Sequence, residues 1–282
     1  MAVPTNFGAN GLTGPGGGTS GVKGQGLYDV DTVENGPIGA QLFDTSDGSE
    51  YVYAYFAGAC GPGLIAAIDS SVSIQTSFNA AFVDSGGTAK DTYAAGDTLI
   101  FLQSSDITSD DLVNTFAGGN LLITDDTGEG HKYKIRSHKA GGTTETNTIG
   151  LEIYAPGLEI AIVSEASASI VGHPYNHLTV ANNGTDDVIR GVTLVDVAAG
   201  EYAWIQKKGP GIVLADESAG TIAAGTIAVL SDSVNGAAEP LNTAAVNSEA
   251  DTPALNFAEP QVGKFMTVAV DTEYVPIILN IV

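Results

Sequence analysis

Residues 120–136 have the sequence NLLITDDTGEGHKYKIR, and this stretch decides the fold class. The apolar residues of 120–124 lead into the turn-forming segment DDTGEG at 125–130, and apolar and polar residues then alternate in 132–136. Alternation with a period of two between turn residues is typical of strands that have one face in solvent. The stretch therefore predicts a β-hairpin.

The same pattern of short apolar strands between turns extends in both directions from the hairpin. Further strands are predicted at 50–57, 64–68, 98–102 and 149–155. Glycine supplies 36 of the 282 residues, about twice its usual share, and only 15% of the chain is charged. These features predict an all-β protein built from small β-barrels or β-sandwiches. One short helix is expected at 109–117, since Ser109 can cap it and Gly118 can end it.

Composition and repetition divide the chain into three parts. Residues 1–26 include GPGGGTSG, so we expect a Gly-rich N-terminal arm. This arm is either flexible or becomes ordered on a neighbouring subunit. A weak repeat follows, because EY…GPGLIAAID at 50–69 resembles EYAWI…GPGIVLAD at 201–216. This repeat predicts two related β domains, at 27–165 and 166–282.

The charge balance limits the partners. The chain has 33 acidic and ten basic residues, a formal net charge of −23. Such a surface repels phosphate backbones, so no nucleic-acid partner is expected. The segment Met1–Thr5 lacks a signal-peptide pattern, and no apolar run reaches the roughly 18 residues of a membrane span, so we expect no membrane partner. The single cysteine, Cys60, lies in an apolar segment and is expected in the core.

No catalytic pattern emerges from the sequence. GGGTSG at 16–21 matches a dinucleotide-binding motif only formally, without the flanking strand and helix. His173 and His177 are four residues apart, but Pro174 between them opposes a helical zinc site. The acidic turns 125–129 and 186–187 lack the spacing of an EF-hand loop. We expect no enzyme activity, no catalytic residue, no cofactor and no metal site; calcium binding by an acidic turn stays open.

Basic residues offer the candidate contacts with other proteins. Lys132, Lys134 and Arg136 alternate along one predicted strand, and Lys139 follows them, so four of the ten basic residues lie together. They form either a solvated face or a contact strip for acidic groups of a neighbouring subunit. A second candidate is Trp204 with Lys207 and Lys208, because tryptophan beside cations is common at interfaces.

Two stretches resemble virion structural proteins of tailed phages of the marine and cyanobacterial type. One is GVTL…AAGEYAWIQ at 191–206 followed by AAGT at 223–226, and the other is FAGGNLLITDDTGEGHKYKI at 116–135. The likeness covers roughly residues 27–282. The motifs are strands and turns, so the resemblance is more specific for a virion protein than for a position in the virion.

The resemblance implies a capsid decoration (cement) protein that binds the major capsid protein on the outer surface of the shell. It further implies assembly in the host cytoplasm, and it transfers no active site. We also expect a homo-oligomer; symmetry makes a trimer reasonable, although no feature of the sequence counts subunits. Alternatives left open are another virion subunit, such as a head fibre or tail tube, a carbohydrate-binding surface module and, least favoured, an enzyme such as a depolymerase.

Overall fold

The computed structural model describes residues 12–13, 25–68, 74–105, 107, 114–139, 147–163, 165–182, 188–241 and 260–281. All regular structure in these ranges is β, which confirms the predicted fold class. The chain forms two compact units: unit 1 comprises Met1–Asp69 and Tyr175–Val282, and unit 2 comprises Ser70–Pro174.

This division corrects the domains expected from the sequence. The expected boundary at 165/166 lies just before a strand of unit 2, Ser167–Val171, and unit 2 is inserted between two parts of unit 1. Both copies of the weak repeat lie within unit 1, where Glu50–Tyr55 pairs antiparallel with Tyr202–Leu214. The repeat therefore reflects two similar neighbouring strands rather than two related domains.

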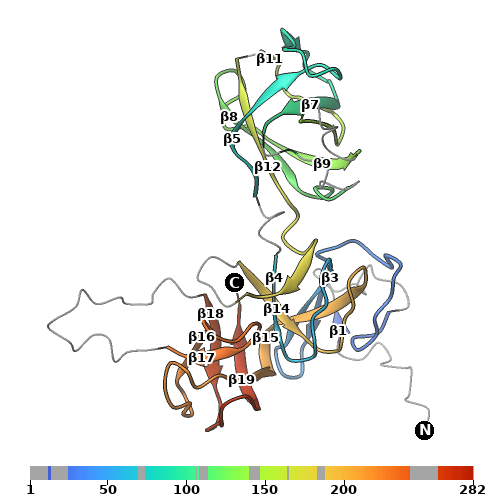
Figure 1. Ribbon diagram of the computed structural model, residues 1–282. Coiled ribbons are helices and arrows are strands. Elements are labelled where there is room, and N and C mark those ends of the chain that lie inside the picture. Colours follow the sequence, from blue (N-terminus) through green and yellow to red (C-terminus); the bar gives the residue numbers. More distant parts are fainter. Residues whose placement is uncertain are drawn as a thin grey trace, which may run out of the picture. The chain divides into compact units, whose positions relative to one another are not determined.

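Unit 2 is a closed six-stranded barrel, coloured teal through green to yellow in Figure 1. Around the barrel the order is β10-β7-β5-β12-β8-β9. Its strands are β5 (Ile74–Val83), β7 (Leu99–Gln103), β8 (Asn120–Asp125), β9 (Lys132–His138), β10 (Thr148–Ile153) and β12 (Ser167–Val171), and β6 (Thr92–Tyr93) pairs with β11 (Ile162–Val163) beside them. Alternate residues point inward and form one apolar core that includes Phe82, Ile100, Leu121, Ile135 and Leu151.

The predicted hairpin forms as expected. Strands β8 and β9 pair antiparallel, with Leu121 opposite Tyr133, and positive φ angles at Gly128 and Gly130 close the turn between them. The expected helix at 109–117 falls partly outside the described residues, and its described end, 114–117, is a turn. The expected arm at 1–26 also lies outside them, except for 25–26 and for Leu12–Thr13, which pairs with Gln41–Asp44.

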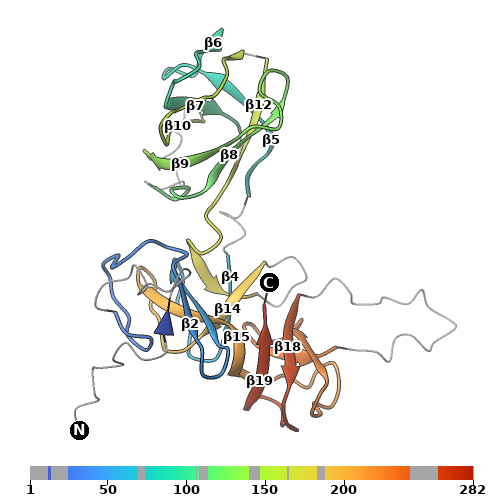
Figure 2. The same ribbon diagram turned by 180° about the vertical axis from the view of Figure 1, so that it is seen from behind.

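Unit 1 is built around one large antiparallel sheet (Figures 1 and 2). The path through it is β1-β2-β3-β15-β19-β18-β16-β17, with β14 pairing β15 and β4, and β13 pairing β4. The strands are β1 (Leu12–Thr13), β2 (Gln41–Asp44), β3 (Glu50–Tyr55), β4 (Ile65–Ile68), β13 (Leu178–Val180), β14 (Ile189–Thr193), β15 (Tyr202–Leu214), β16 (Ile227–Leu230), β17 (Ala238–Pro240), β18 (Gln261–Phe265) and β19 (Tyr274–Asn280).

The long strand β15 changes partners half-way along. Its first half pairs with β3 and its second half with β19, and the pairing with β3 shifts register between Gln206 and Lys208. The buried amide of Gln206 holds this irregularity, because its Nε2 donates to the carbonyl oxygens of Lys208 (3.1 Å) and Pro210 (2.8 Å). Gly209 has a φ of 93° and lies against Ser49. The partner switch is therefore fixed by backbone geometry and by one side chain.

A polar cluster around a buried carboxylate lies beyond the end of β15; Ser231 in this cluster is buried, while Ser218 and Ser233 are exposed. The Asp216 carboxylate is 3% exposed and accepts hydrogen bonds from the hydroxyls of Ser218 (2.7 Å), Ser231 (2.5 Å) and Ser233 (2.5 Å). Burial raises the pKa of Asp216, but these hydrogen bonds outweigh burial and lower it to about 2. Asp216 thus stays ionised in the core of unit 1 and joins the turns that follow β15 and β16.

Candidate protein-interaction site

Strand β19 has apolar residues on both of its faces. Val275, Ile277 and Leu279 are buried in the core of unit 1, while Tyr274, Pro276 and Ile278 are exposed. A strand with one solvated face normally carries polar residues there. The outer face of β19 therefore departs from the usual pattern, and large exposed apolar patches are typical of interaction sites.

The neighbouring strand continues this apolar face. Pro210 and Ile212 of β15 lie opposite Ile278 and Pro276, and Ile212 is 51% exposed. On the other side, the N–H of Met266 donates to the Pro276 carbonyl oxygen (3.0 Å), which holds this half-exposed methionine beside β19. The exposed apolar side chains thus form a contiguous surface over β15, β19 and the end of β18.

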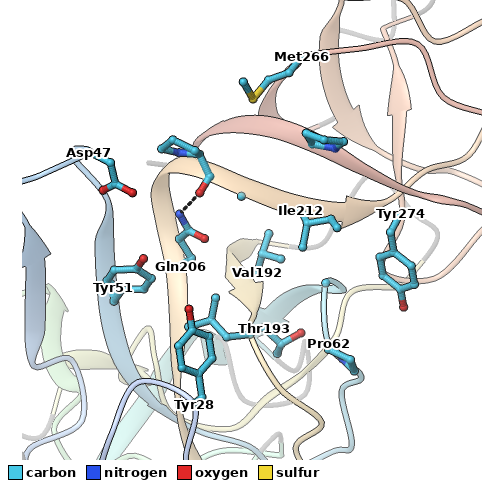
Figure 3. A pocket seen from close by; sticks show the side chains of 15 residues that line it. Tyr28, Asp47, Tyr51, Pro62, Val192, Thr193, Gln206, Ile212, Met266 and Tyr274 are labelled. Carbon is cyan, nitrogen blue, oxygen red and sulfur yellow. Dashed lines mark hydrogen bonds between the residues drawn. The ribbon is translucent and has the colours of Figure 1, made fainter. Parts of the chain in front are cut away.

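The apolar surface borders a hollow of about 760 Å³, which we call the tyrosine hollow (Figure 3). Figure 3 shows Asp47 and Tyr51 on one side, Tyr274 on the opposite side, and Val192 and Ile212 between them. All its lining residues belong to unit 1: Tyr28, Asp47, Tyr51, Pro62, Gly63, Val192, Thr193, Leu194, Gln206, Pro210, Gly211, Ile212, Met266, Tyr274 and Pro276. The hollow is mostly apolar and has three tyrosines.

Glycine and glutamine shape the hollow. An added Cβ at Gly63, whose φ is 71°, would come within 2.7 Å of the Tyr274 ring, so the ring packs directly on the Gly63 backbone. The Nε2 of Gln206 is occupied by hydrogen bonds to two backbone carbonyl oxygens of β15. The hollow is therefore a mostly apolar contact surface whose shape depends on the close packing of Tyr274 on Gly63.

Acidic residues lie at one edge of the hollow. Burial raises the pKa of Tyr51, and the nearby negative charges of Asp47 and Asp44 raise it further. A hydrogen bond from Ser49 lowers this pKa, but its effect is smaller than that of burial. Both aspartates accept hydrogen bonds from backbone N–H groups of their own turn, Asp44 from Ser46 (2.8 Å) and Asp47 from Ser49 (2.8 Å). The turn between β2 and β3 thus presents fixed negative charge beside an apolar surface.

Unit 2 presents the predicted contact strip on the outside of its barrel. Lys132, Lys134 and Arg136 are exposed on β9, while Ile135 between them points into the core. Arg136 forms an ion pair with Glu152 on β10 (Nη1–Oε1, 3.0 Å). Lys132 and Lys134 form no ion pair within the described parts of the chain. We call these three residues the basic strip; Lys139 is exposed just beyond the end of β9.

Apolar side chains lie beside the basic strip. Tyr154, 55% exposed, follows β10, and its N–H donates to the Lys134 carbonyl oxygen (3.1 Å). Leu99 of β7 is 52% exposed and pairs with Glu152. This outer face of the barrel therefore combines cations with large apolar groups, a composition found at protein interfaces.

No family model matches this chain, and no curated protein or solved structure matches it either.

The second predicted contact group does not form a surface patch. Trp204 is 1% exposed and packs against Tyr53, with ring centroids 5.4 Å apart. The prediction that Trp204 contacts a partner is wrong, because β15 is a central strand whose residues are covered on both sides here. Lys207 is half-buried with its ammonium 5.6 Å from the centroid of the Tyr175 ring, and Lys208 is ion-paired with Glu50 (3.1 Å).

Cys60 and His138, two potentially reactive side chains, are buried in the fold. Cys60 is buried as expected, and burial raises the pKa of its thiol to about 11, so the thiol stays protonated. His138 is also buried: Nε2 accepts the N–H of Phe116 (2.8 Å), and Nδ1 lies 2.6 Å from the Lys139 carbonyl oxygen. His173 and His177, considered for a metal site, belong to different units.

Two further observations concern metals and membranes. Within the described ranges, no three His, Cys, Asp or Glu side chains gather where they could hold a metal ion. The described residues also include no helix long and apolar enough to cross a membrane.

Sequence reasoning missed the tyrosine hollow. Its strongest sequence signal is YVPIIL at 274–279, where apolar residues occupy both parities of a strand. Such a strand is either covered on both faces or exposes an apolar face. The pattern could have marked β19, but the lining residues come from four strands and several loops spread between 28 and 276, which only the fold brings together.

Proposed function

We propose that this chain is a structural virion protein of a tailed phage, which binds the outside of the capsid and stabilises the mature shell. The observation that supports this most is the tyrosine hollow with its adjoining apolar surface on β15 and β19. An apolar surface of this kind is costly to leave in water, and covering it with another protein removes that cost.

Three other features support the proposal. The virion-protein phrases at 116–135 and 191–226 lie in β-strands and turns of both units. The net charge of −23 suits an outer surface, because it repels packaged nucleic acid. The described residues form sheets with many backbone hydrogen bonds, which is consistent with a structural protein that binds neighbouring subunits.

The proposed activity needs binding and no chemistry. A protein that binds the expanded shell but not its precursor shifts the equilibrium toward the expanded form by mass action. Each contact can be modest, since a shell offers many copies of the same site and the stabilisation is summed over them. The major capsid protein is the proposed partner of the hollow.

Replacing Ile212 with aspartate is expected to weaken binding to expanded, undecorated capsids at least about tenfold. The substitution places a charge in the middle of the apolar surface, where a covering partner would have to desolvate it. Binding can be measured by co-sedimentation with capsids from the phage that encodes the chain, and shell stability by the temperature at which the capsid ruptures.

The matched control is Val188→Asp, because Val188 is similarly exposed (47%) but does not line the hollow. We expect Val188→Asp to bind like the wild type. The capsid proposal is rejected if the wild-type protein binds no capsid form. An equal loss of capsid binding in both variants would instead show that the hollow is not the surface that contacts the capsid. Gold-labelled protein located on intact particles separates a capsid position from a head fibre or tail tube.

A carbohydrate-binding module is the second candidate, and the tyrosines of the hollow favour it. Tyr28 and Tyr274 line the hollow and are 58% and 50% exposed, so their rings are accessible for stacking on a sugar. If the hollow binds carbohydrate, a glycan array should show hits that Tyr274→Ala abolishes. An array without hits, together with observed capsid binding, would reject the carbohydrate-binding candidate and retain the capsid proposal.

A further inference from the structure

We infer that the basic strip of unit 2 binds the acidic unit 1 of a second copy of this chain, so that copies associate head to tail. This inference goes beyond the proposed function, because it concerns contacts between copies rather than contact with the shell. Its test needs no capsid, so its outcome is independent of capsid binding.

The distribution of charge between the units carries the inference. Unit 1 contains 20 acidic and five basic residues, counted over 1–69 and 175–282, which gives −15. Unit 2 contains 13 acidic and five basic residues over 70–174, which gives −8, and three of those five basic residues form the basic strip. The strip is therefore a local cationic surface on an acidic chain, and it is complementary to the acidic surface of unit 1 of another copy, the unit with the larger negative charge.

Two of the three cations of the strip are not paired with an acidic group within the described chain. Lys132 and Lys134 are two residues apart on the same face of β9 and have no acidic partner there, whereas Arg136 has Glu152. Desolvation lowers the pKa of Lys134, and the positive charge of Lys132 lowers it further. An acidic surface laid on the strip relieves this repulsion.

The proposed contact between copies includes apolar groups as well as charges. Tyr154 and Leu99 are half-exposed beside the strip, and surfaces that combine such groups with cations supply the anchors of protein interfaces. Salt-screened ion pairs alone contribute little, so the apolar neighbours provide the affinity while the charges set the orientation. Because the two surfaces differ, the contact is heterologous, and repeating it yields a ring or a filament.

Lys134→Glu tests the inference, with Lys264→Glu as the matched control. Both lysines are exposed on strands, and each change shifts the net charge by the same amount, but Lys264 is on β18 of unit 1. We expect wild-type protein to self-associate in sedimentation velocity at about 50 mM salt and less at about 500 mM. Lys134→Glu should weaken this association at least about tenfold and Lys264→Glu by no more than about twofold.

A mixing experiment identifies the head-to-tail arrangement. Fluorescently labelled Lys134→Glu protein keeps its acidic unit 1, so it should still co-sediment with wild-type protein although it does not associate with itself. Three results would overturn the inference. They are a wild type that stays monomeric at low salt, equal weakening by Lys264→Glu, and failure of labelled Lys134→Glu to bind the wild type.

Discussion

Replacing Gly209 with alanine is expected to destabilise unit 1 by about 4 kcal/mol, as the sum of backbone strain and steric overlap. Gly209 has a φ of 93°, a conformation that residues with a Cβ rarely adopt. An added Cβ would also lie 2.6 Å from Ser49 Oγ and 2.8 Å from Ser49 Cα. The contact with Cα cannot be relieved by rotating a side chain, so β3 and β15 would have to separate.

Gly200→Ala is the control that separates the two causes. Gly200 has a similar φ of 88°, but an added Cβ there would meet no atom within 4 Å. Gly200→Ala should therefore cost about 1–2 kcal/mol, from strain alone. If the two variants lose equal stability, the overlap with Ser49 has no effect and the described packing of β15 on the β2–β3 turn is wrong.

Trp204 provides the measurement for unit 1. It is the single tryptophan of the chain and is buried in unit 1, so its fluorescence during urea unfolding reports that unit and not the barrel. A probe confined to one unit is needed, because a two-unit chain need not unfold in a single transition.

Replacing Asp216 with alanine is expected to destabilise unit 1 by about 2 kcal/mol, because it leaves the buried hydroxyl of Ser231 without its acceptor. Ser218 and Ser233 also lose this acceptor, but both residues are exposed and can donate to water instead. Asp216→Asn keeps an acceptor oxygen and the side-chain shape, so it should cost less. The ordering Ala below Asn below wild type, measured by Trp204 fluorescence, checks the role of the cluster.

Asp216 also predicts a pH dependence. Its pKa is about 2 in the folded protein and 3.8 when unperturbed, so the unfolded chain binds more protons between these values. The stability that ionised Asp216 contributes is complete above pH 3.8 and is lost as the pH falls through about 2. The stability difference between wild type and Asp216→Asn should shrink over this window; a difference that is constant from pH 5 to 2 would contradict the lowered pKa.

The positions of the strands in the sequence were more predictable than the way in which the strands pair in the fold. The hairpin at 120–136 and the strands near 50–55, 65–68, 99–103 and 148–153 follow from local alternation and turn residues, and all of them form. The exposed basic strip follows from the same alternation, because a strand places alternate residues on one face. These features depend on neighbours in the sequence.

The candidate site was much less predictable. The hollow brings Tyr28, Tyr51 and Tyr274 together from segments more than 200 residues apart. Trp204 was expected at the surface because tryptophan beside lysines suggests an interface, but its exposure depends on what covers β15. A residue's surroundings depend on which strands pair, and pairing across an inserted unit leaves no periodic signal in the sequence.

The sequence by itself determined that this protein is all-β, strongly anionic and rich in turns, since composition and alternation act over a few residues. Only the tertiary structure decided that residues 70–174 form an inserted barrel, that the repeated segments pair within one sheet, and that an apolar face of β15 and β19 stays exposed. The physical reason is that burial is a property of non-local strand pairing, which local patterns do not specify.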